Sequence, residues 1–176
     1  MKKFSIVVAM DEEMGIGRDN DLPWPRLNGD MKHFAEVTTA GAEAGKLNAA
    51  IMGRKTWESI PEGRRPLEGR VNAVLSRGEV QLPEGVLLFH SLEDALNGLS
   101  DMKEVDKLFV IGGANVFAQA IPDPNCEKIY LTKIEGKFEC DTFLAPISGQ
   151  YGQVWGSEQN EDAGIKYRFM VLERGR

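Results

Sequence analysis

Three short stretches of the chain combine glycine, small polar and basic residues directly after apolar runs. They are Met52–Thr56 (MGRKT), Leu75–Arg77 (LSR) and Ile111–Ala114 (IGGA). Glycine lets backbone N–H groups approach a phosphate, and a helix N-terminus adds partial positive charge. Although the glycine pair alone could equally be a tight strand-to-helix turn, the three stretches together predict a site for a nucleotide with a separate terminal phosphate.

A second chemical signal is the carboxylate of Asp30, at the head of a helical pattern. Position alone leaves two readings open. The carboxylate can be satisfied by backbone amides of the first helical turn, or it can bind a planar, amidine-like edge through two parallel hydrogen bonds, with Met31 and Phe34 as an apolar wall. Arg70 is likewise either a solvated loop arginine or the partner of a carboxylate at the far end of a ligand.

The stretch Gly15–Asp30 leads into this carboxylate. Its glycines and the two prolines that bracket Trp24 exclude a regular helix or a central strand. Irregular loops of this length are usually functional or disordered, and a tryptophan between prolines favours packing over disorder. We therefore expect a lid over the ligand site, followed by a helix with Asn28 as its N-cap.

Several common sites are disfavoured by the motifs. No G-x-G-x-x-G follows the first strand, no G-x-x-x-x-G-K-[ST] is present, and no G-x-S-x-G is present, which argues against a standard Rossmann NAD site, a P-loop enzyme and an α/β-hydrolase. The histidines and cysteines lack metal-ligand spacing, so no metal is expected. These residues are His33, His90, Cys126 and Cys140.

The composition is that of a globular protein of 176 residues, with 42% hydrophobic and 27% charged residues. A net charge of −6 argues against nucleic acid as a partner. No apolar run approaches the ~18 residues of a membrane span, and the N-terminal run is too short for a signal peptide. We expect a cytoplasmic, monomeric protein with reduced cysteines and no membrane partner.

The elements that must position these residues alternate between strands and helices. The predicted strands are Phe4–Met10, Leu47–Met52, Val71–Leu75, Gly85–Phe89, Lys107–Ile111, Lys128–Ile134, Gln153–Glu158 and Tyr167–Glu173. The predicted helices are Asp30–Val37, Arg54–Ile60, Leu92–Leu99 with Ser91 as N-cap, and Ala114–Ala120. This order predicts one α/β domain, 1–176, with a mainly parallel sheet, helices on both faces and an antiparallel C-terminal edge. The last two strands are expected to pair around the polar turn Gln159–Gly164.

A set of ordered motifs covers essentially the full length of the chain. The motifs are Gly15–Gly17 with Leu22–Trp24, Asp30 with Phe34, Ile51–Ile60, Arg65–Arg70, Leu75–Arg77, Ile111–Gly113, Tyr130–Thr132 and Asp141–Phe143. In this combination the chain resembles the dihydrofolate reductase family. The resemblance implies an eight-stranded sheet and NADPH-dependent reduction of 7,8-dihydrofolate to tetrahydrofolate, with antifolates such as methotrexate or trimethoprim as inhibitors. It also implies cis bonds at Gly112-Gly113 and Arg65-Pro66.

The resemblance assigns roles at the substrate end. It places Asp30, Thr132, Leu22 and Trp24 in the catalytic set. Arg70 would bind the α-carboxylate of the glutamate tail. The remaining substrate-binding residues would be Val8, Ala9, Met31, Phe34, Ile60 and Ile111.

The resemblance also assigns a cofactor site for NADPH, in which the basic residues would face the 2′-phosphate and the glycine turn the pyrophosphate. These residues would be Ala9, Ile16, Gly17, Gly53, Arg54, Lys55, Thr56, Leu75, Ser76, Arg77, Gly112, Gly113, Ala114, Val116 and Phe117. Phe117 departs from the family pattern, which often has a tyrosine there, so the role of that hydroxyl would be missing or taken by water. Asp30 also departs, since an Asp replaces the Glu of vertebrate-like members.

Two rival functions differ in class. A related pterin or pyrimidine reductase, such as the reductase of riboflavin synthesis, would share the sheet, but Asp30, Phe34 and Arg70 together favour a folate. A catalytically silent nucleotide-binding or interaction module would need neither the Leu22–Trp24 loop nor Asp30.

Overall fold

The computed structural model describes residues 1–175, so the predicted domain end at Arg176 lies outside the described residues. The helices are α1 (Asn28–Thr39), α2 (Arg54–Ser59), α3 (Leu92–Asp101) and α4 (Ala114–Ala120), with a 3₁₀ turn at Glu62–Arg64. The strands are β1 (Phe4–Met10), β2 (Gly15–Gly17), β3 (Leu47–Gly53), β4 (Arg70–Leu75), β5 (Leu87–Phe89), β6 (Val105–Gly112), β7 (Cys126–Ile134), β8 (Thr142–Phe143), β9 (Tyr151–Gly156), β10 (Asn160–Asp162) and β11 (Ile165–Arg174).

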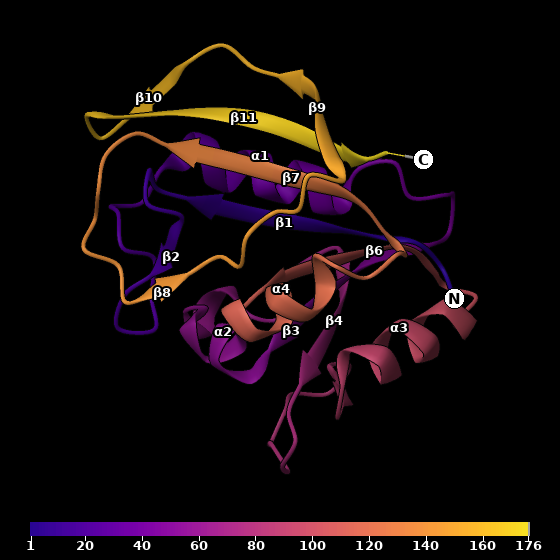
Figure 1. Ribbon diagram of the computed structural model, residues 1–176. Coiled ribbons are helices and arrows are strands. Elements are labelled where there is room, and N and C mark those ends of the chain that lie inside the picture. The colour runs from indigo at the N-terminus through magenta and orange to yellow at the C-terminus, as the bar shows by residue number, and fades with distance from the viewer. Residues whose placement is uncertain (176) are drawn as a thin grey trace.

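The central sheet has the order β10-β11-β7-β1-β6-β3-β4-β5, with β9 also paired to β11. The pairs from β7 through β5 are parallel, whereas β11 runs antiparallel to β7, β9 and β10. Within residues 1–175, nine strands therefore fill eight positions, because β9 and β10 share the outer flank of β11 (Figure 1). The predicted α/β class, the mainly parallel sheet and the antiparallel C-terminal edge are confirmed.

The gap between β9 and β10 is closed by Ser157. Its backbone N–H donates to the carbonyl of Phe169 at 2.8 Å, and its Oγ accepts from the N–H of Phe169 at 2.9 Å. One serine thus satisfies the polar backbone groups of β11 that neither strand reaches.

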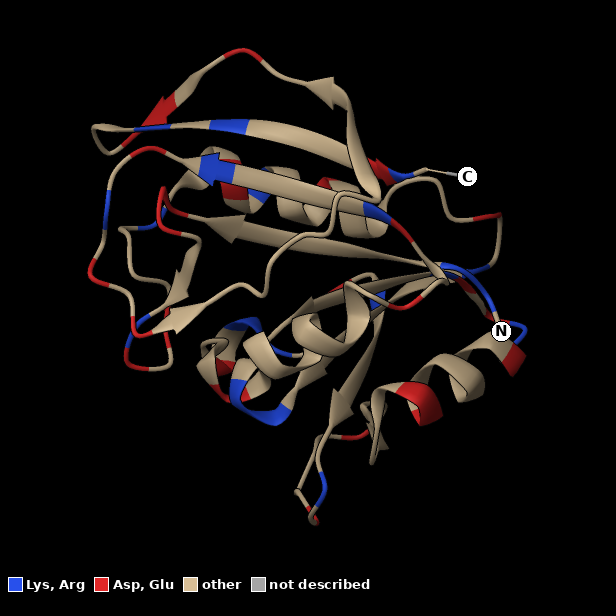
Figure 2. Cartoon of the chain, viewed as in Figure 1, with Lys and Arg blue, Asp and Glu red and all other residues tan. Residues whose placement is uncertain are grey.

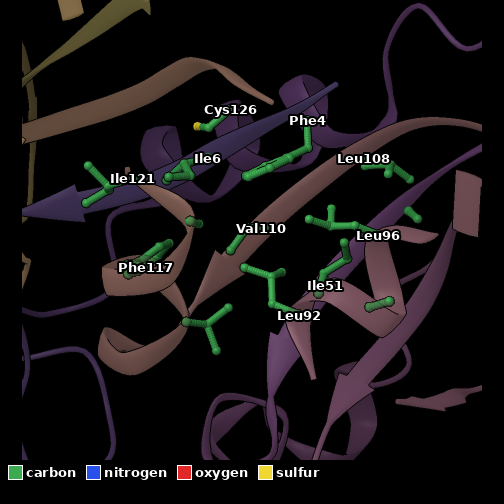
Figure 3. Close-up of a cluster of buried hydrophobic side chains, with 14 of the residues drawn as sticks. Phe4, Ile6, Ile51, Leu92, Leu96, Leu108, Val110, Phe117, Ile121 and Cys126 are labelled. Atoms are coloured by element: carbon green, nitrogen blue, oxygen red, sulfur yellow. The ribbon is translucent and has the colours of Figure 1, made fainter. Parts of the chain in front are cut away.

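Helices cover both faces of the sheet because successive strand residues point to opposite sides. On β3, Ala49 and Ile51 belong to the core cluster beneath α3 and α4, whereas Ala50 and Met52 belong to the cluster with Trp57 of α2. Figure 3 shows the first cluster, in which side chains of β1, β3 and β6 meet Leu92 and Leu96 of α3 and Phe117 of α4. In Figure 1, α1 passes behind β7 and β1, and α4 lies in front of the sheet.

Three local expectations need correction. The stretch after Gly15 is not wholly irregular, because β2 pairs with β8 to form a small second sheet. Asn28 is the first residue of α1 rather than its N-cap; Leu27 occupies the cap position, without a side-chain hydrogen bond. The predicted polar turn Gln159–Gly164 contains β10, so the reversal is confined to Ala163 and Gly164.

Two other local expectations are confirmed. The Ser91 side chain caps α3 by accepting from the N–H of Asp94 at 3.0 Å. The Arg65-Pro66 and Gly112-Gly113 bonds are cis. Among the described residues, no helix is both long and apolar enough to cross a membrane.

Arg174, at the end of β11, ties the C-terminal strand to the end of α4. Its guanidinium donates to the carbonyls of Cys126, Ile121 and Asp123 at 2.8–2.9 Å and lies 4.7 Å from the centroid of the Tyr151 ring. Because hydrogen bonds from a charged donor contribute roughly 1.5–3 kcal/mol, we expect Arg174→Ala to lower the free energy of unfolding by about that amount. Urea denaturation measures the loss. Arg168→Ala, which removes an exposed arginine from the same strand, is the matched control and should change little.

Candidate active site

A deep cleft of about 2310 Å³ crosses the carboxyl ends of the parallel strands. Ligands of open α/β sheets bind at this edge. The structure brings to this cleft all the residues predicted for catalysis, substrate binding and cofactor binding. Among the described residues no cluster of three or more potential metal ligands is present.

Asp30 lies in the first turn of α1, and only 8% of it is exposed. The hydroxyl of Thr132, on β7, donates to Asp30 Oδ1 at 2.7 Å. Burial raises the pKa of Asp30, the Thr132 hydrogen bond opposes that effect, and the negative charge of Asp162 adds to it. The partner of this carboxylate inside the protein is thus a side chain of the sheet, and Asp30 faces the cleft as a hydrogen-bond acceptor for a ligand.

Apolar side chains surround Asp30 on the cleft wall. Met31 and Phe34 follow it on α1, and Val8 and Ala9 approach from the end of β1. These positions suit a flat ring whose edge meets the carboxylate.

Arg70 closes the outer end of this wall and is not a freely solvated side chain. Its guanidinium donates to Thr38 Oγ1 at 3.0 Å and to the carbonyl of Glu68 at 2.8 Å, and it lies 5.9 Å from the centroid of the Phe34 ring. Burial lowers the pKa of Arg70, which still remains cationic. The arginine is therefore held in place at the cleft, and the reading as a solvated loop residue is excluded.

The opposite end of the cleft is built for close backbone approach. Gly112 has φ +147°, and a Cβ there would lie 3.0 Å from Thr56 Oγ1. Only glycine fits both the backbone conformation and the space. The Gly112-Gly113 turn and the start of α2 therefore form one concave surface.

Basic residues flank that surface at the start of α2 and in the loop after β4, where Figure 2 shows the ribbon in blue. Arg54, Lys55 and Arg77 are exposed. Arg54 is partly neutralised, because its guanidinium lies 3.0 Å from the carboxylate of Glu58. His90 also lines the cleft, with its Nδ1 2.9 Å from the carbonyl of Ser76. We did not predict His90, although its position directly after a strand that ends at the same edge was a signal for it.

The predicted lid crosses the cleft. At its tip, the side chain of Asn20 donates to the carbonyl of Lys55 at 3.2 Å, and the N–H of Asp19 donates to Asp141 Oδ2 at 2.9 Å. Leu22 is 45% exposed, whereas Trp24 is buried and packs edge-on against Phe138 with 5.8 Å between ring centroids. The lid is thus anchored on both sides of the cleft.

The base of the lid depends on Asp11, a residue that the sequence reasoning missed. Asp11 Oδ1 accepts from the N–H groups of Glu13 and Gly15, and Oδ2 accepts from the N–H of Phe138 and the thiol of Cys140. Burial raises the pKa of Asp11, but these hydrogen bonds outweigh it, so the net pKa is lowered. One carboxylate therefore joins the lid to the loop that precedes β8.

Asp11→Ala should loosen this base, because hydrogen bonds to a charged acceptor contribute roughly 1.5–3 kcal/mol. We expect the Gly15 amide to exchange with solvent about 10–100-fold faster, as measured by hydrogen-exchange NMR. In the unaltered protein the protection should weaken as the pH falls through the lowered pKa of Asp11. Glu12→Ala, at the exposed neighbouring position, should leave the exchange unchanged.

A mostly parallel sheet with a large cleft at the carboxyl ends of its strands, lined by a glycine turn and a buried carboxylate, is typical of α/β enzymes that bind their ligands at this edge. The protein is of that class. The family model described as dihydrofolate reductase matches residues 3–174, and the chain belongs to the dihydrofolate reductase family.

Individual relatives agree with this assignment. The chain is 39% identical to a dihydrofolate reductase of Drosophila melanogaster, over 99% of both chains. It is 40% identical to a dihydrofolate reductase of Mus musculus, over 99% of this chain and 98% of the other. It is also 41% identical to a bifunctional dihydrofolate reductase-thymidylate synthase of Glycine max, over 99% of this chain but 34% of the longer protein.

Proposed function

We propose that the protein reduces 7,8-dihydrofolate to 5,6,7,8-tetrahydrofolate with NADPH, by hydride transfer to the pterin C6 and protonation of N5. The observation that carries this proposal is the buried pair of Asp30 and Thr132 in the wall of the cleft. The other end of the same cleft is formed by a glycine turn with basic residues on both sides. Membership of the dihydrofolate reductase family supports it.

At the substrate end, Asp30 would accept hydrogen bonds from the 2-amino group and the adjacent ring N–H of the pterin. A carboxylate and an amidine-like edge form two parallel charge-assisted bonds, which fix both the position and the orientation of the ring. Arg70 would pair with the α-carboxylate of the glutamate tail. Val8, Met31, Phe34, Ile60 and Ile111 would contact the pterin and benzoyl rings.

At the cofactor end, the residues present fit NADPH. The Gly112-Gly113 turn leaves next to Thr56 a space that a Cβ would fill, which suits a pyrophosphate against the backbone. Arg54, Lys55 and Arg77 would face the 2′-phosphate. When bound, NADPH supplies the hydride.

The side chains of the protein would contribute alignment, electrostatics and exclusion of water. The negative charge of Asp30 favours a protonated pterin, and water would deliver the proton to N5. Ile16 and Leu22 would cover the nicotinamide, and Trp24 would steady the water near the ring. Phe117 has no hydroxyl to contribute, so any polar contact at that position would come from water.

The decisive assay mixes the protein, NADPH and dihydrofolate and follows the absorbance decrease at ~340 nm that accompanies cofactor oxidation. We expect turnover that methotrexate abolishes and that trimethoprim, a second antifolate, also inhibits. Oxidation that requires a pyrimidine or a flavin precursor instead of dihydrofolate would establish the rival reductase. Binding of NADPH without turnover of any of these substrates would establish a silent nucleotide-binding module.

We also propose a cytoplasmic, monomeric protein. The free thiols of Cys126 and Cys140 are consistent with a reducing compartment. Size-exclusion chromatography with light scattering tests the oligomeric state.

A further inference from the structure

The first turn of α1, which holds Asp30, is capped from a distant strand. No side chain at the helix start itself provides a cap hydrogen bond. Instead, Asp162 Oδ2, on β10, accepts from the N–H of Gly29 at 2.7 Å. The same oxygen accepts from the hydroxyl of Tyr167, on β11, at 2.6 Å. The residue next to Asp30 is therefore fixed by a hairpin from the other end of the chain.

The space around Gly29 shows that this arrangement is closely built. A Cβ at Gly29 would lie 2.3 Å from the Tyr167 hydroxyl oxygen and 3.0 Å from Asp162 Oδ2. Tyr167 is 2% exposed and packs with Trp24, Leu27 and Ile134. Glycine is thus required at position 29 so that the carboxylate and the phenol can reach the helix backbone.

The charges around Asp30 come from several elements. Asp162 on β10 is the charged group that acts on Asp30 through space, Tyr167 on β11 and His33 on α1 are further titratable groups here, and Thr132 on β7 provides a hydroxyl. The other charged residues on these parts of the elements are exposed: Lys32, Glu36, Lys133, Glu161, Lys166 and Arg168. The hydrogen bonds from Tyr167 and Gly29 lower the pKa of Asp162, so this group is an anion at neutral pH. Burial and Asp162 each raise the pKa of Tyr167, which stays a neutral donor. His33 is stacked on Phe169 with 3.7 Å between ring centroids, and burial lowers its pKa.

We propose that Asp162 is a positioning residue for Asp30, which anchors the helix turn that carries Asp30 and places a second negative charge beside it. The anchoring acts through the Gly29 amide, directly before Asp30. The charge acts through space, because two carboxylates near each other disfavour the ionised form of each. The expected effect of Asp162 on the kinetics rests on the proposed function, whereas the electrostatic coupling between Asp30 and Asp162 does not.

Substitutions at position 162 separate the charge from the anchor. Asp162→Asn removes the charge but keeps a carbonyl oxygen that can accept from both Gly29 and Tyr167. Asp162→Ala removes both. Glu161→Gln, on the same strand and exposed, makes the same change in net charge without a contact to α1 and is the matched control. Asp162→Ser provides a second neutral acceptor in case the asparagine variant fails to fold.

The primary measurement is a carbon-13 NMR titration of the Asp30 carboxyl in the substrate-free protein. We expect the titration midpoint of Asp30 to fall in Asp162→Asn and Asp162→Ser and to stay unchanged in Glu161→Gln. Equal midpoints in the asparagine variant and the control would overturn the proposal.

Kinetics then test the consequence for turnover. The acid limb of the kcat/KM profile for dihydrofolate should move to lower pH in Asp162→Asn. Asp162→Ala should in addition lose roughly tenfold or more in kcat/KM at every pH, because a small displacement of a catalytic group is costly. If the NMR midpoint falls but the kinetic profile does not move, the coupling stands and the catalytic role of Asp30 is what fails.

Discussion

Asp30→Asn is expected to lower turnover at neutral pH by roughly 10²–10³-fold, the usual cost of removing a preorganised electrostatic group at a reacting centre. The carbonyl of the asparagine can still accept the hydrogen bond that Thr132 donates at 2.7 Å to the native carboxylate, but it carries no charge to favour a protonated pterin. Part of the activity should return in acid, where the substrate is already protonated in solution. The measurement is kcat from about pH 5 to about pH 8 with saturating NADPH. Unchanged turnover at neutral pH would contradict the assigned role.

The same substitution should not destabilise the folded protein. A loss of turnover in this variant can therefore be attributed to the active site and not to unfolding. Burial raises the pKa of Asp30 in the folded state, so the folded protein binds this proton more tightly than the unfolded chain does. The resulting contribution to stability is full below the unfolded pKa and is lost as the pH rises through the folded pKa. At neutral pH the ionised carboxylate is therefore a cost, and the neutral asparagine removes it. We expect an equal or higher melting temperature at neutral pH, with a smaller difference in acid.

Arg77→Ala is expected to reduce kcat/KM for NADPH by roughly 10–100-fold while that for NADH changes little. The reason is that a charge-assisted hydrogen bond to a phosphate contributes roughly 1.5–3 kcal/mol, and NADH lacks the 2′-phosphate. Steady-state kinetics with both cofactors measure the ratio. Equal losses for the two cofactors would place the phosphate elsewhere.

Arg54 provides an internal comparison for this prediction. Because its guanidinium lies 3.0 Å from Glu58, part of its charge is already neutralised, and Arg54→Ala should have a smaller effect than Arg77→Ala. Glu58→Gln should then improve the preference for NADPH. Arg168→Ala, outside the cleft, controls for the general loss of a positive charge and should leave both cofactors unaffected.

The central architecture was predictable because its signals are local. The apolar run of β1, the glycine that ends β3 and the Ser91 cap of α3 each follow from residue types within a few positions. The alternation of strands and helices then restricts the topology to a mostly parallel sheet. The resemblance added the eight positions of the sheet and the two cis bonds.

What the sequence did not show depends on contacts between distant segments. Asn28 is a good cap by type, but a carboxylate from β10 already satisfies the Gly29 amide at 2.7 Å, and Asn28 lies inside the helix instead of capping it. Gly15–Gly17 form a strand only because β8 pairs with them. Neither partner can be inferred from the residues of the segment itself.

In the candidate site, too, features with local sequence signals were predictable and contacts between distant segments were not. Strand ends predicted which edge of the sheet carries the ligand-facing residues, because parallel strands place their carboxyl ends together. The interaction partners of individual side chains were not predictable. Arg54 forms an ion pair with Glu58, Arg70 donates a hydrogen bond to Thr38, and Asp11 accepts hydrogen bonds from two loops. Side-chain partners depend on loop geometry, for which the sequence carries no periodic signal.

The Ser157 bridge has a consequence for self-association. An uninterrupted outer strand next to β11 would expose a long row of free backbone groups, which is a template for edge-to-edge pairing and aggregation. Two short strands separated by residues 157–159 present a shorter and interrupted template. This matters here because Val154 and Trp155, on β9, are 59% and 50% exposed and would favour such pairing. We therefore expect the broken edge to disfavour pairing of this apolar border with a second chain.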